Sequence, residues 1–494
     1  MIVNFLLIVP LLTVLTLLLV KNEQYIKPIA LVGSFVQLLV IIGTLIQYLG
    51  AASLKNNGAM LLQTDVNWFA PLHIHYHIGV DGISMVMLLL TALIVIAAIL
   101  VSWKEAFLQK EFFILLILLS FGAYGFFIAI DLFLMFFFLE IAVVPKFLLI
   151  LIWGSGKKAY SATKLVLMLI GASALLFMGI VGIYYNQPNG LQSLNMLQIA
   201  QMQLPYHVQL TFFPFLFIGF GVFTALFPFH TWVPDGHPAA PTAGSMFLAG
   251  ISMKLGGYGL LRLVMLLMPA AAQFYAPYII LLAAIGILYG AFATMVQKDL
   301  KYMNAYSSIS HCGFVLLGIG MLTPVALTGA VLQMVSHGLM TALFFAAIGM
   351  IYSRTHTRII EEMGGLLVYM PFISGVFILA GLASLGLPGL SGFTAEMTVL
   401  VGSWQQPVTA YRVATIVAAA SIVITAVYVL RAIGTVLMGK GKIYSDDTPT
   451  DARWYEKWAG IILVLGILVV GIMPFLLLKL ISPSILYLPQ SIFK

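Results

Sequence analysis

Charged residues are scarce in this sequence. Lys, Arg, Asp and Glu account for 8% of the 494 residues, and 62% of the residues are hydrophobic. A typical soluble domain has about 25% charged residues. Apolar runs of about 18 to 25 residues recur from end to end, and each is long enough to cross the hydrocarbon core of a bilayer as a helix. The composition excludes a soluble protein, and the run length excludes a transmembrane β-barrel.

Cysteine is nearly absent. The single residue, Cys312, lies in an apolar segment, so the chain can form neither a disulfide framework nor a thiolate metal cluster. Phosphate-binding and dinucleotide-binding glycine motifs are also missing. The formal net charge of +7 comes from basic residues scattered singly over short loops, which is not the pattern of a nucleic-acid-binding surface. We therefore expect no cofactor, metal ion or nucleic acid on this chain, and lipid as its only ligand.

The apolar runs predict an all-α membrane helix bundle with about fourteen transmembrane helices. The first run, Ile2–Val20, has no basic region before it and no cleavage site after it, so we expect a retained helix and no targeting peptide. The spans are expected to begin near residues 2, 27, 82, 111, 132, 163, 211, 241, 276, 302, 325, 371, 408 and 457.

Most of the Lys and Arg residues lie in alternate connections between these spans. They are Lys21, Lys27, Lys104, Lys110, Lys157, Lys158, Lys298, Lys301, Arg354, Arg358, Lys440, Lys442, Arg453 and Lys457. Because basic loops stay in the cytoplasm, this bias predicts that both termini lie on the external side of the membrane. An even number of spans agrees with that topology.

Proline and glycine interrupt two of the spans. Pro228 falls in the seventh, and Pro388 falls in the twelfth together with Gly386, Gly389 and Gly392. Broken helices in a membrane are tolerated only inside protein or beside a wet cavity, and paired breaks are typical of transporters built from inverted repeats. The breaks lie five spans apart, which predicts such a repeat. The expected divisions are helices 1–3 in residues 1–110, five-helix repeats in 111–268 and 269–440, and a C-terminal helix in 441–494.

Four charged residues lie within or next to predicted spans: Glu140, Lys146, Lys254 and Glu396. A charge at the centre of a bilayer costs at least about 2.5 to 3.5 kcal/mol, so each one needs a reason. One reason is proton loading and release, because burial in general brings the pKa of carboxyl and ammonium groups nearer to neutrality. The alternative is a static ion pair, and Lys146 has the further alternative of extending its ammonium group to the membrane surface.

Histidines supply a second set of candidates. His311 and His337 lie in apolar spans and His230 follows the seventh span; the pKa of imidazole suits proton relay, although a single buried His is also a common core residue. Serines that could hold water or bond across helices accompany two of them: Ser307, Ser308, Ser310 and Ser336.

A third group of histidines alternates in the sequence LHIHYHIG. The spacing of His73, His75 and His77 places three imidazoles on one face of an extended strand. A zinc site is one interpretation, but sequence supplies no fixed fourth ligand, and an external loop that faces solvent is the favoured reading.

One long segment carries a close resemblance to a known family: FPFHTWVPDGHPAAPTAGSMFLAGISMKLGGYGLLRL. It resembles the antiporter-like membrane subunits of respiratory complex I, the proton-pumping NADH:quinone oxidoreductase. Further matches are FFFLEIAVVP, KYMNAYSSISHCGFVLLGI, QMVSHGLMTALFF and LASLGLPGLSGFTAEM. Within the family the M subunit, counterpart of the mitochondrial fourth ND subunit, is the most similar, because Glu396 stands where the L and N subunits usually have lysine.

The resemblance implies roles for the charged and histidine residues of the predicted spans. Glu140 would be the fifth-helix carboxylate, Lys254 the central eighth-helix lysine, His311 and His337 a hydrated bridge, and Glu396 the terminal site. It also implies neighbouring L-type and N-type subunits, a bacterial cytoplasmic membrane, and FMN and iron–sulfur clusters in other subunits, with no redox step on this chain.

The sequence departs from the family at one position. Where the family usually has a lysine in the broken seventh helix, this chain has Phe223, and Lys146 stands in the fifth helix where an uncharged residue is usual. We hypothesise that the lysine function has moved from one helix to the other. Six residues separate Glu140 from Lys146, so on an ideal helix they do not share a face unless Pro145 bends the chain.

Two other functions stay open at this stage. The chain resembles, in the same segment, an ion-translocating subunit of a multisubunit cation/proton antiporter or of a membrane-bound hydrogenase. It is also open to the interpretation of a structural membrane scaffold whose proton path has been lost, for which the missing seventh-helix lysine is the main support. The retained acids, lysines and histidines argue against a lost path.

Overall fold

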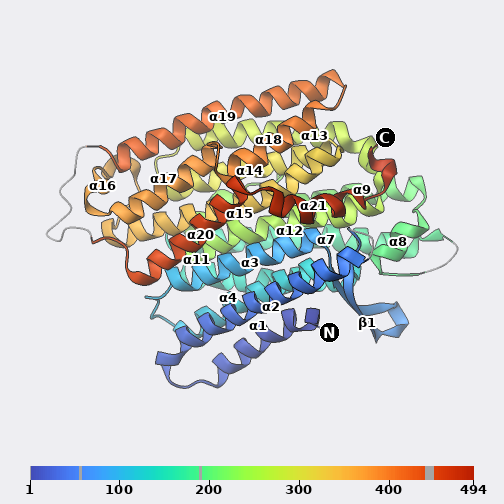
Figure 1. Ribbon diagram of the computed structural model, residues 1–494, viewed down its shortest axis with the longest axis horizontal. Coiled ribbons are helices and arrows are strands. Elements are labelled where there is room, and N and C mark those ends of the chain that lie inside the picture. The colour runs from blue at the N-terminus through green and yellow to red at the C-terminus, as the bar shows by residue number, and fades with distance from the viewer. Residues whose placement is uncertain (1, 55–57, 189–191, 440–449, 494) are drawn as a thin grey trace.

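The computed structural model describes residues 2–54, 58–188, 192–439 and 450–493. It is a bundle of long helices that run side by side along the longest axis of the molecule (Figure 1). Helices α1 (Ile2–Leu19) and α2 (Ile26–Leu54) form one edge of the bundle, and α19 (Thr409–Val436) forms the opposite edge. Buried apolar side chains fill the space between them, as expected for helices that are hydrophobic on all sides.

Twelve helical segments among the described residues are long and apolar enough to cross a membrane. Two more cross the bundle beside them: α14, which is rich in serine, and a twelfth span formed by two shorter helices. The predicted bundle of about fourteen spans is therefore confirmed. The unbroken spans not yet given are α3 (Gly82–Val101), α4 (Gln109–Ile128), α7 (Lys158–Tyr185), α13 (Pro269–Met295), α14 (Leu300–Gly320), α15 (Pro324–Thr355) and α20 (Trp454–Ile472).

Both predicted breaks are present. Helix α9 (Tyr206–Phe223) ends before Pro228, and the chain turns before α10 (Trp232–Ala239) begins. Helix α17 (Pro371–Leu385) ends at Gly386, and α18 (Ser391–Trp404) begins five residues further on. Gly386 and Gly389 have φ values of 76° and 91°, a conformation that glycine adopts without steric cost.

Two further spans are irregular. The fifth span is divided at Ala142 into α5 (Leu132–Ile141) and α6 (Val143–Trp153), because Pro145 has no N–H for the carbonyl of Ile141. The eighth span consists of α11 (Thr242–Phe247) and α12 (Met253–Gly259), each followed by a π-helical segment. These segments are η4 (Leu248–Ser252) and η5 (Leu260–Met265). Short π-helical turns often occur at functional sites.

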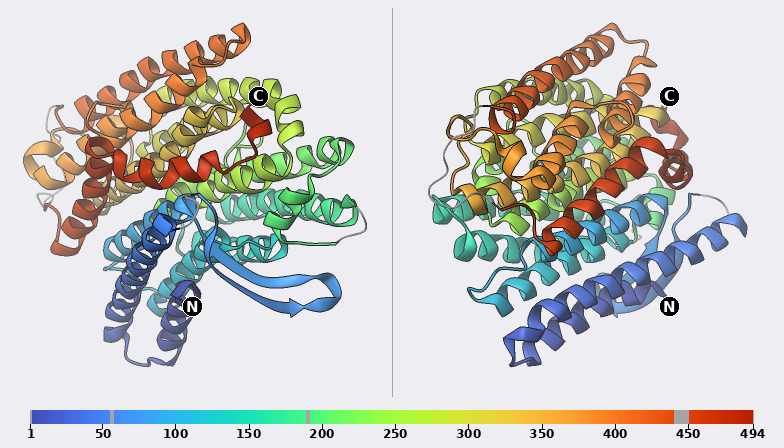
Figure 2. Two further views of the ribbon diagram at one scale, coloured as in Figure 1. Left: turned by 45° about the vertical axis from the view of Figure 1, so that its right-hand side comes forward. Right: turned by 60° about the vertical axis from the view of Figure 1, so that its left-hand side comes forward.

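A β-hairpin connects α2 to α3. Strands β1 (Leu61–Phe69) and β2 (Ile74–Val80) pair antiparallel and project from the bundle as an arm (Figure 2). The sequence predicted only a loop with an extended segment here. The hairpin, the short helix α8 (Met196–Met202), α21 (Phe475–Leu486) and both chain ends gather at the same end of the bundle (Figure 1), so the two termini share one side.

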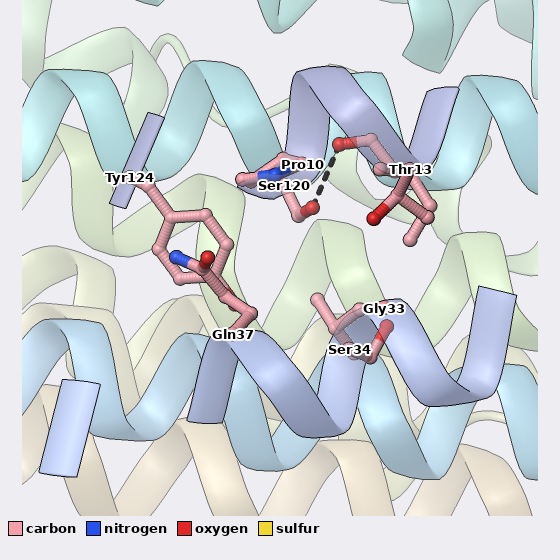
Figure 3. Close-up of a pocket in the computed structure, with 9 residues that line it drawn as sticks. Pro10, Thr13, Gly33, Ser34, Gln37, Ser120 and Tyr124 are labelled. Carbon is pink, nitrogen blue, oxygen red and sulfur yellow. Dashed lines mark hydrogen bonds between the residues drawn. The ribbon is translucent and has the colours of Figure 1, made fainter. Parts of the chain in front are cut away.

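Helix α1 contains Pro10, which deprives the Leu6 carbonyl of its usual backbone donor. The side chain of Gln37 on α2 replaces that donor, with Nε2 lying 3.0 Å from the Leu6 oxygen. Gln37 and Tyr124 point into a small cavity between α1, α2, α3 and α4, with a volume of about 10 Å³ (Figure 3). The amide of Gln37 thus compensates for the N–H that Pro10 lacks.

We expect Gln37→Leu to destabilise the protein by about 1 to 3 kcal/mol, because it leaves a buried carbonyl without a donor. The measurement is thermal unfolding of the detergent-solubilised complex. The control is the same change in a Pro10→Ala background, where the helix itself supplies the N–H and the loss should shrink. Equal losses in both backgrounds would show that Gln37 acts in another way.

Candidate functional site

Lys254 lies at the centre of the eighth span, fully buried. Its Nζ donates to the carbonyl of Ala249 and lies 2.7 Å from Nδ1 of His337 on α15. Both groups are bases, and a contact this short requires a proton between them. The pair therefore shares one proton, held by Lys254 or by His337.

The next member of the site beside His337 is His311 of α14. The two rings lie 5.5 Å apart between centroids and are tilted by 33°. Cys312, next to His311 in the chain, places its Sγ 3.8 Å from Nδ1 of His337. Both histidines are buried, so no bulk water separates the rings.

His311 is held from both sides. Its Nδ1 is 3.0 Å from Oε1 of Glu396 on α18, and its Nε2 is 3.0 Å from Oγ of Ser384 on α17. Gln333 approaches the same Nδ1 at 3.4 Å. The Glu396 carboxylate and the imidazole are both buried, so this is a hydrogen-bonded acid and base in an apolar interior. Together, four spans place Lys254, His337, His311 and Glu396 in one row.

The serines near the row differ from one another. Ser307 and Ser308 donate to the carbonyl of Asn304 in their own helix, at 2.8 and 3.0 Å. Ser336 does reach another helix, with its Oγ donating to Ser391 at 2.8 Å. That bond joins α15 to the first residue of α18, just beyond the break in the twelfth span.

Glu140 and Lys146 lie on either side of the break in the fifth span. The Lys146 side chain is buried and its Nζ lies 5.6 Å from the ring centroid of Phe223. Within the described part of the chain, neither Lys146 Nζ nor Glu140 Oε1 has a hydrogen-bond partner, although the charge of Glu140 acts on Lys146. Lys146 therefore faces the interior beside Phe223 and does not extend to the membrane surface.

His230 lies apart from the row. Its ring stacks on Phe227 at 5.4 Å and packs edge-on against Tyr289 at 4.7 Å. These aromatic contacts place it beside the break in the seventh span.

The hairpin histidines have separate surroundings. His73 has a φ of 53° in the turn before β2 and contacts Tyr184, so the expectation of three imidazoles on one strand face is wrong. His75 pairs with Asp65 at 2.7 Å. Burial lowers the pKa of His77, and the neutral ring accepts from Asn195 and donates to Gln63. Among the described residues, no three acidic, Cys or His side chains converge as a metal site would require.

Several buried polar residues were missed from the sequence. Ser384 and Gln333 carry no charge, so the cost of burial did not single them out. Asp81 and Arg262 form a buried ion pair, but both lie near the ends of predicted spans. Lys301 was expected in a cytoplasmic connection, yet it lies in the first turn of α14, is buried, and donates to the carbonyl of Ala240 at 2.8 Å.

A multi-pass bundle whose buried acids and bases lie in a row has the features of a membrane protein that transfers ions or protons. Comparison with known proteins gives the family. The model described as "NADH:quinone oxidoreductase/Mrp antiporter, TM" matches residues 129–428. The chain therefore belongs to this family.

Individual relatives show which members of the family this chain resembles. NAD(P)H-quinone oxidoreductase chain 4 2 of Microcystis aeruginosa is 40% identical over 390 residues, which cover 78% of this chain and 70% of the relative. The chloroplastic chain 4 of Physcomitrium patens is 37% identical over 420 residues, or 84% and 83%. The predicted resemblance to an antiporter-like membrane-arm subunit is confirmed.

Solved structures show the same fold. A chain of respiratory complex I from Thermus thermophilus superposes with a TM-score of 0.90 at 24% identity, with 100% of both chains covered. A chain of the Mrp complex from Dietzia sp. gives 0.87 at 18% identity, with 100% of this chain and 99% of that chain covered.

Proposed function

We propose that this chain is a non-redox, proton-translocating subunit of an NADH or NAD(P)H:quinone oxidoreductase, in which quinone reduction elsewhere drives protons through buried Glu, Lys and His side chains. The observation that carries the proposal is the row from Lys254 through His337 and His311 to Glu396. Each member is a buried group that gains and loses protons. The two ends of the row are in hydrogen-bond contact, and the two histidine rings lie 5.5 Å apart between centroids.

Protons pass along such a row by short steps. Between Lys254 and His337 the step is 2.7 Å, and between His311 and Glu396 it is 3.0 Å. The centroids of the two rings lie 5.5 Å apart, and both nitrogens of His311 already have partners, so this step requires one ring to reorient. Ser384 and Gln333 then act as positioning residues that fix the His311 ring.

The energy for pumping comes from other subunits. Moving one charge against 100 mV costs about 2.3 kcal/mol, and the sequence has no fuel-binding motif. FMN and iron–sulfur clusters would reside in those other subunits. Neighbouring L-type and N-type membrane subunits would flank this chain in a bacterial cytoplasmic membrane, with both termini on the external side.

The ammonium group of Lys146 takes the place of the lysine that the family usually has in the seventh helix and that this chain lacks. It lies against Phe223, the position where the family usually has that lysine, and on the same span as Glu140. The helix is interrupted at Ala142, between α5 and α6, so the spacing on an ideal helix no longer decides which faces the two side chains share. Opening and closing of this pair would then gate Lys254.

A cation/proton antiporter subunit is the second possibility for this fold. The structural likeness to the Mrp complex supports it. The relatives that are 40% and 37% identical are quinone oxidoreductase chains, and on that ground we favour the first function.

Replacing the central lysine tests the proton row. Lys254→Met should lower NADH-driven proton pumping in inverted membrane vesicles by about tenfold or more, because it removes a group that must carry the proton. The control is Lys298→Met, which changes an exposed lysine. Normal pumping by an assembled Lys254→Met complex would contradict the proposal.

Exchanging two residues tests the transposed lysine. Lys146→Met should reduce pumping severalfold, and the double change Lys146→Met, Phe223→Lys should restore it, because the ammonium returns to the same space from the other helix. The matched control is Lys146→Met, Phe220→Lys, which places a lysine one turn away on α9. If Lys146→Met pumps like wild type, Glu140 works without a lysine from either helix.

A further inference from the structure

A second buried charge pair lies on the same span as Lys254 and takes no part in the row. Arg262 of η5 pairs with Asp81, the residue before α3, and their side chains are 6% and 0% exposed. Tyr258 lies midway between Lys254 and Arg262, so residues spaced by four place the three side chains along one side of the span. An ion pair this deeply buried does not by itself stabilise a protein, so its presence needs a reason.

Hydroxyl groups connect this pair to the middle of the span. Ser84 Oγ lies 2.9 Å from Asp81 Oδ1 and 2.8 Å from the hydroxyl oxygen of Tyr258. The same Tyr258 oxygen lies 2.8 Å from the carbonyl of Phe127 at the end of α4. All of these groups are buried, and they come from three different spans.

The two hydroxyl groups have two ways to arrange their protons. In one, Tyr258 donates to Ser84 and Ser84 donates to Asp81. In the other, Ser84 donates to Tyr258 and Tyr258 donates to the Phe127 carbonyl. A hydrogen-bonded chain that can reverse its direction in this way can pass a proton from one end to the other.

We propose that Tyr258, Ser84 and Asp81 carry protons between Lys254 and the end of the bundle that holds the hairpin and both termini. This route rests on the proposed proton-translocating function and gives it a connection to one membrane surface. The row from Lys254 to Glu396 crosses from helix to helix, whereas this route follows the length of the eighth span.

An N–H bond of Lys254 breaks and its proton binds the Tyr258 oxygen, while the Tyr258 proton passes to Ser84 and the Ser84 proton to Asp81 Oδ1. Lys254 ends neutral, Asp81 ends as a carboxylic acid, and each hydroxyl again holds one proton. Arg262 then faces a neutral acid, and this loss of pairing favours release of the proton from Asp81.

Lys254 is able to serve both routes. In this structure its Nζ points toward Ala249 and His337. Tyr258 is one turn away, a rise of about 6 Å, which a change of lysine side-chain rotamer can span. Lys254 would thus alternate between His337 and Tyr258.

The test compares hydroxyl-free and hydroxyl-retaining variants. Tyr258→Phe and Ser84→Ala should each lower NADH-driven proton pumping in inverted vesicles by about tenfold, because a proton-carrying group is lost. Ser84→Thr keeps the hydroxyl and should pump like wild type. Tyr124→Phe is the matched control, since it removes a buried hydroxyl elsewhere on α4. Blue native gels measure the amount of assembled complex for each variant.

The outcomes separate this route from the proposed function. Wild-type pumping by Tyr258→Phe and Ser84→Ala would overturn the route, and so would a defect in Ser84→Thr equal to that in Ser84→Ala. If Lys254→Met is defective while both hydroxyl-free variants pump normally, only the route is wrong. If Lys254→Met also pumps normally, the proposed function itself has failed.

Discussion

The need to give every buried cation a hydrogen-bond acceptor shapes this bundle. In a regular helix each carbonyl already accepts the N–H four residues later, so spare acceptors arise where helices are irregular. Lys254 donates to Ala249, which lies in the π-helical segment η4, and Lys301 donates to Ala240, the first residue after α10. The irregular turns and the buried lysines therefore occur together, because an irregular turn provides the free carbonyl oxygen that a buried ammonium group requires.

The pair formed by Glu140 and Lys146 obeys this constraint less completely. Lys146 has the face of Phe223 and the charge of Glu140, but no hydrogen-bond acceptor among the described residues. Cation–π contact contributes about 0.5 to 2 kcal/mol, less than the cost of burying an ammonium group. This pair has fewer direct contacts than Lys254 or Glu396, and it lies at a helix break. Because Glu140 and Lys146 have few direct contacts and lie at a helix break, a neighbouring subunit can change their pairing at a low cost in free energy.

The fold was largely predictable, because each helix that crosses a membrane needs a long apolar run that is visible in the sequence. Run length gave the spans, and Pro228, Pro388 and Gly386 marked the breaks, since their backbone effects are local. Cost of burial singled out Lys254 and Glu396. Ser384 was not predictable, because an uncharged side chain becomes part of the site only when α17 packs beside His311. The π-helical segments also left no signal, since their residues resemble those of any packed helix and the extra residue per turn is imposed by neighbouring spans.

The direction of the row limits what it can do. Lys254, His337, His311 and Glu396 come from the eighth, eleventh, tenth and twelfth spans, so protons moving along the row travel from helix to helix and not from one membrane surface to the other. Such a row moves charge sideways, toward the edge formed by α19 (Figure 1). Net transport therefore requires separate connections along the helix axes. The eighth span, in which a lysine, a tyrosine and an arginine follow one another at intervals of four residues, has the spacing such a connection needs.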